Sequence, residues 1–262
     1  MKPILKNNNF VVETNSTYVS YAKKTLGAPL YNDIKNNFVK IGGNQILRAR
    51  FFGKSPKGSD LENVLFYNIG SGCFTSLIQN GVIFEEMQQS DYVSYCAKYN
   101  VKDECIYEYS IVNNAFNPFC NKTVIATCSN FGDILNMSVK DCWLEIKKAG
   151  WSPKNTNAKA TKIYLDITIS KPKGKITVDK IKHMLDGIVS SLHKYNGNNG
   201  VVIANKLNAA PSYLTDTSIL EDRAFVSIKS DGGLKWNPAD DREMLKGCRI
   251  QIGEKTEIKV LI

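Results

Sequence analysis

Hydrophobic and polar residues alternate most clearly in the second half of the chain, over residues 162–169. Because the side chains of a strand point to opposite faces in turn, this alternation predicts a strand with one apolar face. After a segment rich in Lys, Pro and Gly, apolar residues recur at spacings of four, three and four, which predicts an amphipathic helix capped by Thr177 or Asp179. The apolar face of the strand is Ile163, Leu165, Ile167 and Ile169, and the apolar stripe of the helix is Ile181, Leu185, Ile188 and Leu192.

The first half has a similar order of elements. Residues 45–52 predict a strand that ends at a basic loop, and Asp60 can cap a helix that Gly70 would interrupt. Each half is therefore expected to be a mixed α+β unit. Further strands are expected over 82–84, 106–112 and 123–125, and over 225–229, 249–252 and 257–260, with the last two forming a hairpin through Gly253.

Short motifs occur in the same order in both halves. The clearest is an aromatic-Asn-Pro triplet followed by nine residues and a cysteine, which begins at Phe116 and again at Trp236 and ends at Cys128 and Cys248. We interpret this pattern as an internal duplication that gives two similar mixed α/β lobes related by a pseudo-two-fold axis. The predicted repeats cover 1–132 and 133–262, with an insertion near 196–222. Chance similarity in a chain rich in Lys, Asn and Gly is the alternative.

The composition favours a globular, basic protein. Hydrophobic residues make up 43% of the chain, and 34 Lys and Arg residues against 25 Asp and Glu give a net charge of +9. This excess favours a polyanionic partner such as DNA, while an AT-rich genome is an alternative source of so many Lys and Asn codons. Lysines outnumber arginines, which favours contacts to the phosphate backbone over base readout. The predicted nucleic-acid contacts are Lys54, Lys57, Lys171, Lys173 and Lys175.

Several common classes of protein are disfavoured. No segment is apolar enough for a secretory leader or a membrane span, so we expect a cytoplasmic protein without a membrane partner. Seven cysteines, an odd number without a CxxC pair, argue against a disulfide framework and against a standard zinc site. His183 and His193 are expected to face solvent, which leaves little material for Ser-His-Asp catalysis.

Carboxylates are the remaining candidates for chemistry. Acidic groups that converge in a basic protein can hold Mg²⁺ beside a phosphodiester, because oxygen ligands suit this hard cation. The alternative for each acid is a structural role, as a helix cap or in a solvated turn. The candidate metal ligands are Asp60, Glu62, Glu86, Asp179, Asp186, Asp240 and Asp241.

Some of these acids stand in short motifs that resemble a known family. The segments 60–63 and 80–86 in the first half, and 182–187 and 240–242 in the second, resemble the motifs of RusA-type Holliday-junction resolvases. The resemblance implies Mg²⁺-dependent cleavage of branched DNA, with Asp179, Lys182 and Asp186 as catalytic residues. Tyr67 falls near the position where the helix lysine of the family is expected in the first half, and 177–180 differ from its acidic opening. One composite site, or none, is therefore expected in place of two.

Three functional hypotheses follow. The leading one is a nucleic-acid-binding protein that acts as a Mg²⁺-dependent DNA endonuclease of resolvase-like architecture. The second is a non-catalytic module in which two degenerate repeats bind nucleic acid or protein. The third, less favoured, places a small-molecule site lined by aromatic residues such as Trp143 and Trp236 between the lobes.

Overall fold

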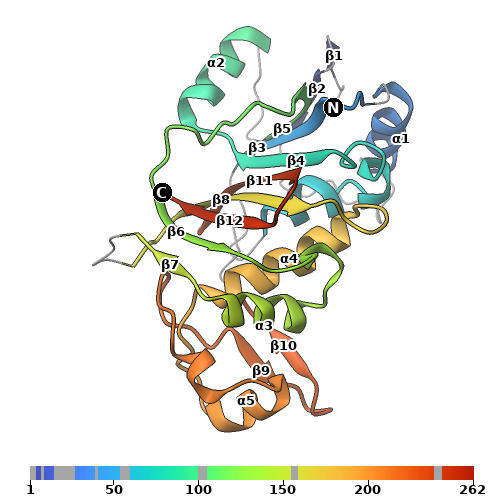
Figure 1. The fold of residues 1–262 in the computed structure, drawn as a ribbon. Coiled ribbons are helices and arrows are strands. Elements are labelled where there is room, and N and C mark those ends of the chain that lie inside the picture. The colour runs from blue at the N-terminus through green and yellow to red at the C-terminus, as the bar shows by residue number, and fades with distance from the viewer. Residues whose placement is uncertain are drawn as a thin grey trace.

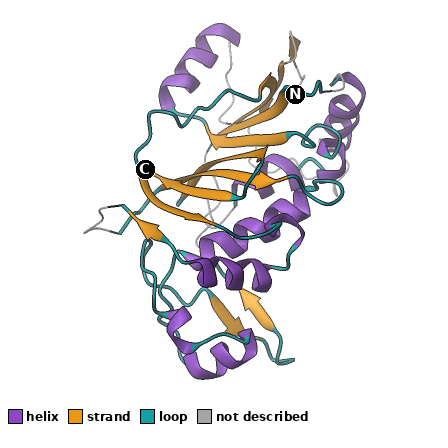
Figure 2. Cartoon of the chain, viewed as in Figure 1, coloured by secondary structure: helices purple, strands orange, loops and turns teal. Residues whose placement is uncertain are grey.

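The computed structural model describes residues 4–6, 9–14, 27–38, 41–53, 60–99, 105–154, 159–238 and 244–262. The fold is α+β, with most strands in one large mixed sheet and a separate pair of strands at one end of the molecule (Figure 2). The strands are β1 (Ile4–Lys6), β2 (Asn9–Thr14), β3 (Gln45–Phe52), β4 (Gly81–Glu86), β5 (Cys105–Asn113), β6 (Val124–Ser129), β7 (Ser152–Pro153), β8 (Ile163–Ser170), β9 (Val226–Ile228), β10 (Leu234–Trp236), β11 (Leu245–Gly253) and β12 (Glu257–Leu261). The α-helices are α1 (Gly27–Asn37), α2 (Gln89–Tyr99), α3 (Val139–Ala149), α4 (Val178–Ser191) and α5 (Gly200–Leu207). A π-helix, η2 (Asn63–Tyr67), and three 3₁₀ helices, η3 (Ser71–Phe74), η4 (Ile134–Asn136) and η5 (Pro211–Leu214), complete the described elements.

The large sheet has the strand order β1-β2-β5-β3-β4-β11-β8-β12-β6-β7. β4 and β11 pair antiparallel at its centre. On each side of this pair the next strand is parallel, β3 beside β4 and β8 beside β11, and the two strands beyond it are antiparallel. The order of strand directions is therefore the same when it is followed outward from the centre on either side.

The strands expected from sequence are observed, but one connection is different. β11 and β12 were expected to form a hairpin, and this was wrong, because β8 lies between them and pairs with both. The turn after Gly253 therefore carries the chain across the end of β8. The apolar face of β8 is fully buried, and its placement between two strands also satisfies the backbone groups on both of its edges.

The two cysteines of the repeated motif occupy different places in the sheet. Cys128 lies on β6, beside the short outer strand β7, whereas Cys248 lies on the central strand β11. β6 also pairs with β12, so the expected boundary at residue 132 would separate this strand from its neighbours in the second half. Both cysteines are buried, as expected, and none of the seven cysteines forms a disulfide.

Helices α3 and α4 cover one face of the sheet (Figure 1). The predicted stripe of α4, from Ile181 to Leu192, is buried, and Thr177 caps the helix by accepting a hydrogen bond from the Lys180 amide. A Cβ atom at Gly187 would lie 2.8 Å from the Cβ of Cys142 on α3, so this glycine permits the close approach of the two helices. The face of α4 opposite its buried stripe is left to polar residues.

The other face of the sheet carries charged side chains in pairs. The Arg48 guanidinium donates to Glu85 at 2.7 Å, and Arg249 donates to Asp166 at 3.0 Å. The segment after β5 crosses this face, and its Asn114 carbonyl accepts a hydrogen bond from Arg249 at 3.4 Å. Along the central strands, apolar side chains point to the face covered by α3 and α4, and charged side chains point to the opposite face. This explains the alternating pattern in their sequence.

A small unit built from α5, η5 and the β9–β10 pair lies below the sheet in Figure 1, and its two helices come from the segment 196–222. Its core includes Phe225 and packs against Trp143 of α3. This unit covers the end of α4, so His193 is 1% exposed, and the expectation that it faces solvent was wrong. His183 is exposed, as expected. No helix among the described residues is both long enough and apolar enough to cross a bilayer.

Candidate functional site

The ammonium of Lys182 is the centre of a cluster that joins the two halves of the chain. Its Nζ lies 2.8 Å from Oδ2 of Asp60 and 2.8 Å from Oε1 of Glu62, both from the segment between β3 and β4. It also lies 3.8 Å from Asp186, one turn further along α4. Residues separated by about 120 positions therefore meet at one point.

Glu62 is the most deeply buried member of this cluster. Its side chain is 0% exposed, and Oε2 has no hydrogen-bond partner among the described residues. Burial raises the pKa of Glu62 to about 7, although the neighbouring Lys182 charge opposes this shift. The pKa of Lys182 is raised well above its ordinary value, because the Glu62 and Asp186 charges outweigh the effect of burial. The lysine is therefore charged, and Glu62 titrates near neutral pH.

The backbone around Asp60 and Glu62 departs from a regular helix. Residues 61–62 begin a helical turn that continues as the π-helix η2, in which the Asn68 amide donates to the Asn63 carbonyl. Leu65 and neighbouring apolar residues anchor this turn in the core. The Asn63 side chain donates to Asp60 at 2.6 Å and so orients that carboxylate toward Lys182. Short π-helical segments are often found at functional sites.

Asp179 lies beside this cluster and has a different partner. The Tyr67 hydroxyl donates a hydrogen bond to the Asp179 carboxylate. Burial, together with this hydrogen bond, raises the pKa of Tyr67 above its ordinary value. The tyrosine therefore interacts with Asp179 through a hydrogen bond from a neutral hydroxyl group. Sequence reasoning gave no sign of this contact.

Of the other candidate metal ligands, only Glu86 belongs to the described residues, and it has a partner outside the cluster. Glu86 forms an ion pair with Lys246 at the end of β4, and Asp240 and Asp241 lie outside the described residues. Among the residues that the structure describes, no group of three or more His, Cys, Asp or Glu side chains is arranged to hold a metal ion. The carboxylates of Asp60 and Glu62 instead contact an ammonium at the point where their oxygens converge.

The basic loops are described only in part. Lys54 and Lys57 lie outside the described residues, whereas Lys171, Lys173 and Lys175 are exposed in the loop between β8 and α4. The backbone of this loop is held in place, because the Lys173 amide donates to Asp133 at 3.1 Å. Its three ammonium groups are therefore presented from a fixed segment at the start of the helix that carries Lys182.

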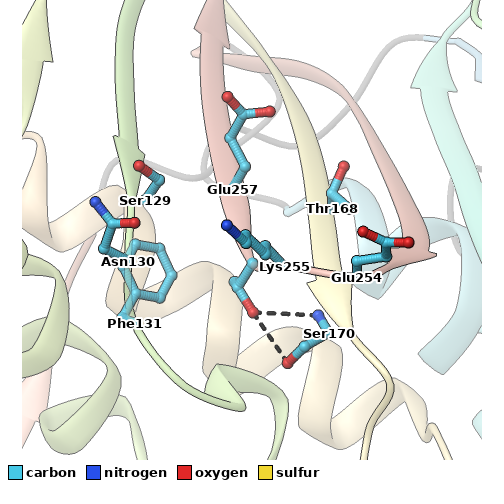
Figure 3. Close-up of a pocket in the computed structure, with 9 residues that line it drawn as sticks. Ser129, Asn130, Phe131, Thr168, Ser170, Glu254, Lys255 and Glu257 are labelled. Carbon is cyan, nitrogen blue, oxygen red and sulfur yellow. Dashed lines mark hydrogen bonds between the residues drawn. The ribbon is translucent and has the colours of Figure 1, made fainter.

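A polar cavity of about 470 Å³ lies next to this loop, at the ends of β6, β8 and β12 (Figure 3). The hydroxyl groups of Thr168 and Ser170 line it, and the Ser170 backbone amide donates to the Thr256 hydroxyl at 3.1 Å. Lys255, Glu254 and Glu257 also line the cavity (Figure 3). With one ammonium and two carboxylates, this cavity has no excess positive charge that could attract a phosphate.

The chain was also compared with known proteins. No protein-family model, no curated protein and no solved structure matches it. The chemistry of the site has therefore to be inferred from the residues of this chain.

Proposed function

We propose that this chain binds nucleic acid and cleaves phosphodiester bonds at one Mg²⁺-dependent site formed by Asp60, Glu62, Lys182 and Asp186. The observation that carries the proposal is the convergence of these three carboxylates on Lys182 from two distant segments. A buried acidic group with a strongly raised pKa beside a specific charged partner is typical of functional sites. The exposed lysines of the loop before α4 supply positive charge for the phosphate backbone.

An internal duplication of resolvase-like architecture is part of the proposal. The order and directions of the sheet strands support it. Read outward from the β4–β11 pair, β4, β3, β5 and β2 have the same order of directions as β11, β8, β12 and β6. In chain order, α1 and α3 follow the first strand of each set, and the segment 61–74 and α4 follow the second. The repeats in this arrangement are 9–113 and 124–261, so the boundary moves from 132 to the segment that joins β5 to β6.

The donor set of the cluster fits a hard divalent cation in its chemistry. Carboxylate oxygens are the ligands that Mg²⁺ prefers, and Oε2 of Glu62 is buried without a hydrogen-bond partner among the described residues. The Lys182 ammonium occupies the point where the Asp60 and Glu62 oxygens converge, so Asp60, Glu62 and Asp186 would hold the ion only once this ammonium has moved aside. When bound, Mg²⁺ would activate a water molecule and stabilise the charge on the leaving oxygen.

The protein side chains have their own tasks in this proposal. Lys182 stays charged and attracts the phosphate group of the substrate to the cluster. Asn63 orients Asp60 through its side-chain hydrogen bond. One such cluster per chain implies one cut per binding event, in contrast to paired cuts by two equivalent sites.

The non-catalytic module remains a second candidate because of one observation. The Lys182 ammonium already neutralises Asp60 and Glu62, and such a cluster could serve only to hold the segment 60–63 on α4. In this alternative, the lysine-rich loop would bind nucleic acid without cleaving it.

A cleavage assay separates the two candidates. Four-way junction, flap and duplex DNA are incubated with the full chain and increasing Mg²⁺ or Mn²⁺. We expect cleavage of branched DNA, a loss of about 100-fold or more in Asp186→Asn, and normal folding of that variant by circular dichroism. Glu145→Gln, an exposed acid on α3, is the matched control and should cleave normally. DNA binding without cleavage at any metal concentration would favour the non-catalytic module.

A further inference from the structure

A second cavity, of about 570 Å³, lies between α1, η3 and the loop before α4. Lys35 and Lys175 line it from segments that are far apart in the sequence. Ile41 and Cys73 provide apolar surface, and the hydroxyls of Thr75 and Ser76 complete the lining used here. Its volume lies in the range of small-molecule sites, about 300–1,000 Å³.

The charged residues that line this cavity are all basic. No aspartate or glutamate is among its described lining residues, and neither Lys35 nor Lys175 forms an ion pair with a described residue. Two ammonium groups without carboxylates create a positive potential that attracts an anion. The hydroxyl groups of Thr75 and Ser76 can add hydrogen bonds to its oxygens. This feature separates the cavity from the one in Figure 3, whose lining includes two carboxylates.

The wall of the cavity is fixed to the segment that leads to the carboxylate cluster. The Gln79 side chain accepts a hydrogen bond from the Ile176 amide at 3.2 Å and donates to the Ile176 carbonyl at 2.8 Å. Lys175 stands just before α4, and Lys182 lies on the second turn of this helix. One to two helical turns, roughly 5–10 Å, separate them along the helix axis. On a strand of B-form DNA this corresponds to about two to three nucleotides.

We propose that this cavity binds one nucleotide of the substrate strand, with its phosphate between Lys35 and Lys175 and its base against Ile41 and Cys73. The inference rests on the proposed function, because it assigns a position on the substrate relative to Lys182. A base that is stacked in a duplex cannot enter a cavity of this kind without leaving the stack. The cavity therefore selects nucleic acid with an unpaired nucleotide near the cleaved bond, such as a flap or a single-stranded end.

Calorimetric titration of the full chain tests the ligand. Thymidine 5′-monophosphate, thymidine and inorganic phosphate are titrated separately, without divalent metal and at low salt. We expect the monophosphate to bind more tightly than either fragment. Lys35→Gln and Lys175→Gln should each weaken the affinity for the monophosphate about tenfold, because each removes a charge-assisted hydrogen bond. Lys229→Gln, an exposed lysine of the inserted unit, is the matched control and should bind normally. No binding up to about 10 mM, or equal affinity for phosphate alone, would overturn the proposal.

A competition experiment distinguishes a free nucleotide from a nucleotide within a strand. A short oligothymidylate should displace the monophosphate, and both lysine variants should bind the oligonucleotide with lower affinity as well. Failure of the oligonucleotide to compete would assign the cavity to a free nucleotide and overturn its role on the substrate strand.

The same variants separate this inference from the proposed function. Lys35→Gln and Lys175→Gln together should reduce the preference for flap over fully paired duplex DNA by about tenfold in binding, with or without cleavage. Nucleotide binding in a protein that never cleaves would contradict the proposed nuclease and leave the cavity assignment standing. Cleavage with an unchanged flap preference in the double variant would contradict the cavity assignment alone.

Discussion

The ammonium of Lys182 and the carboxylate of Glu62 lie 2.8 Å apart although 120 positions separate them in the chain. The lysine is 26% exposed and the glutamate is fully buried, so the ion pair reaches solvent only on the lysine side. Removing one partner should therefore have a larger effect than breaking a surface pair, because the remaining charge would lose its compensation inside the protein.

The first prediction concerns the pH dependence of stability due to Glu62. Its pKa is raised from 4.5 to about 7 in the folded state, so the folded protein binds more protons than the unfolded chain between these values. The free energy of unfolding should therefore fall as pH rises from about 4.5 to 7, by up to about 3 kcal/mol from this group. Glu62→Gln should lack this component, which urea unfolding of both proteins at pH 5 and pH 8 would measure. Parallel pH profiles would contradict it.

The second prediction concerns Lys182. Lys182→Met should lower the free energy of unfolding by about 2–4 kcal/mol at pH 8, because Glu62 would be left charged and unpaired. The loss should be smaller at pH 5, where Glu62 is protonated. The double variant Lys182→Met with Glu62→Gln should recover part of the stability at pH 8. Additive losses in the double-mutant cycle would show that the two side chains are not coupled.

The third prediction concerns the ion pair that attaches the inserted unit to α3. The Lys147 side chain is 0% exposed, and its Nζ donates to Asp216 at 2.7 Å. Burial lowers the pKa of Lys147 despite this partner. Asp216→Ala should destabilise the protein by about 2–4 kcal/mol, whereas Glu145→Ala, which removes the exposed partner of Lys148, should cost less than about 1 kcal/mol. Equal effects in thermal unfolding would contradict the importance of burial.

The fourth prediction concerns His193 and acid. Burial lowers the pKa of His193 from 6.5 to about 4, and its Nδ1 lies 2.6 Å from the Glu221 carbonyl. Between pH 6.5 and 4 the unfolded chain binds this proton and the folded protein does not, so stability should fall as pH decreases through this range, by up to about 3 kcal/mol. His193→Asn should be less stable than the natural protein at pH 7, and the difference in the free energy of unfolding should become smaller toward pH 4. Urea midpoints across this range would test it, and a constant gap would argue against titration of His193.

The fifth prediction concerns the lysines of the loop between β8 and α4. If Lys171, Lys173 and Lys175 each contact a phosphate, replacing all three with Gln should reduce the slope of log K against log salt by about two to three units. Fluorescence anisotropy with duplex DNA at several salt concentrations measures this slope. Replacement of Lys229 and Lys235, exposed lysines of the inserted unit, should leave the slope unchanged.

The local elements were predictable because their signals lie within short segments. The alternation from Ile163 to Ile169 placed β8 correctly, and the stripe from Ile181 with its Thr177 cap placed α4. In each case the side chains that decide the element lie within one or two turns or along one strand.

The remaining features depend on contacts between distant segments. The prediction of a β11–β12 hairpin was wrong because β8 lies between these two strands. The turn residues near Gly253 give no sign that a third strand is inserted there. His193 was expected in solvent because its burial depends on a unit that comes later in the chain. The meeting of Asp60 with Lys182 was not predicted, since spacing along the sequence carries no information on distance across 122 positions.

The central pairing of β4 with β11 has a consequence for synthesis of the protein. Residues 81–86 have no partner on one edge until residues near 250 have left the ribosome. Until then the first half carries a bare strand edge, which is prone to pair with other chains, and it has the acidic side chains of the cluster without their lysine. A truncated product that ends before α4 would therefore be aggregation-prone and would lack the assembled cluster, which makes completion of the chain a condition for solubility.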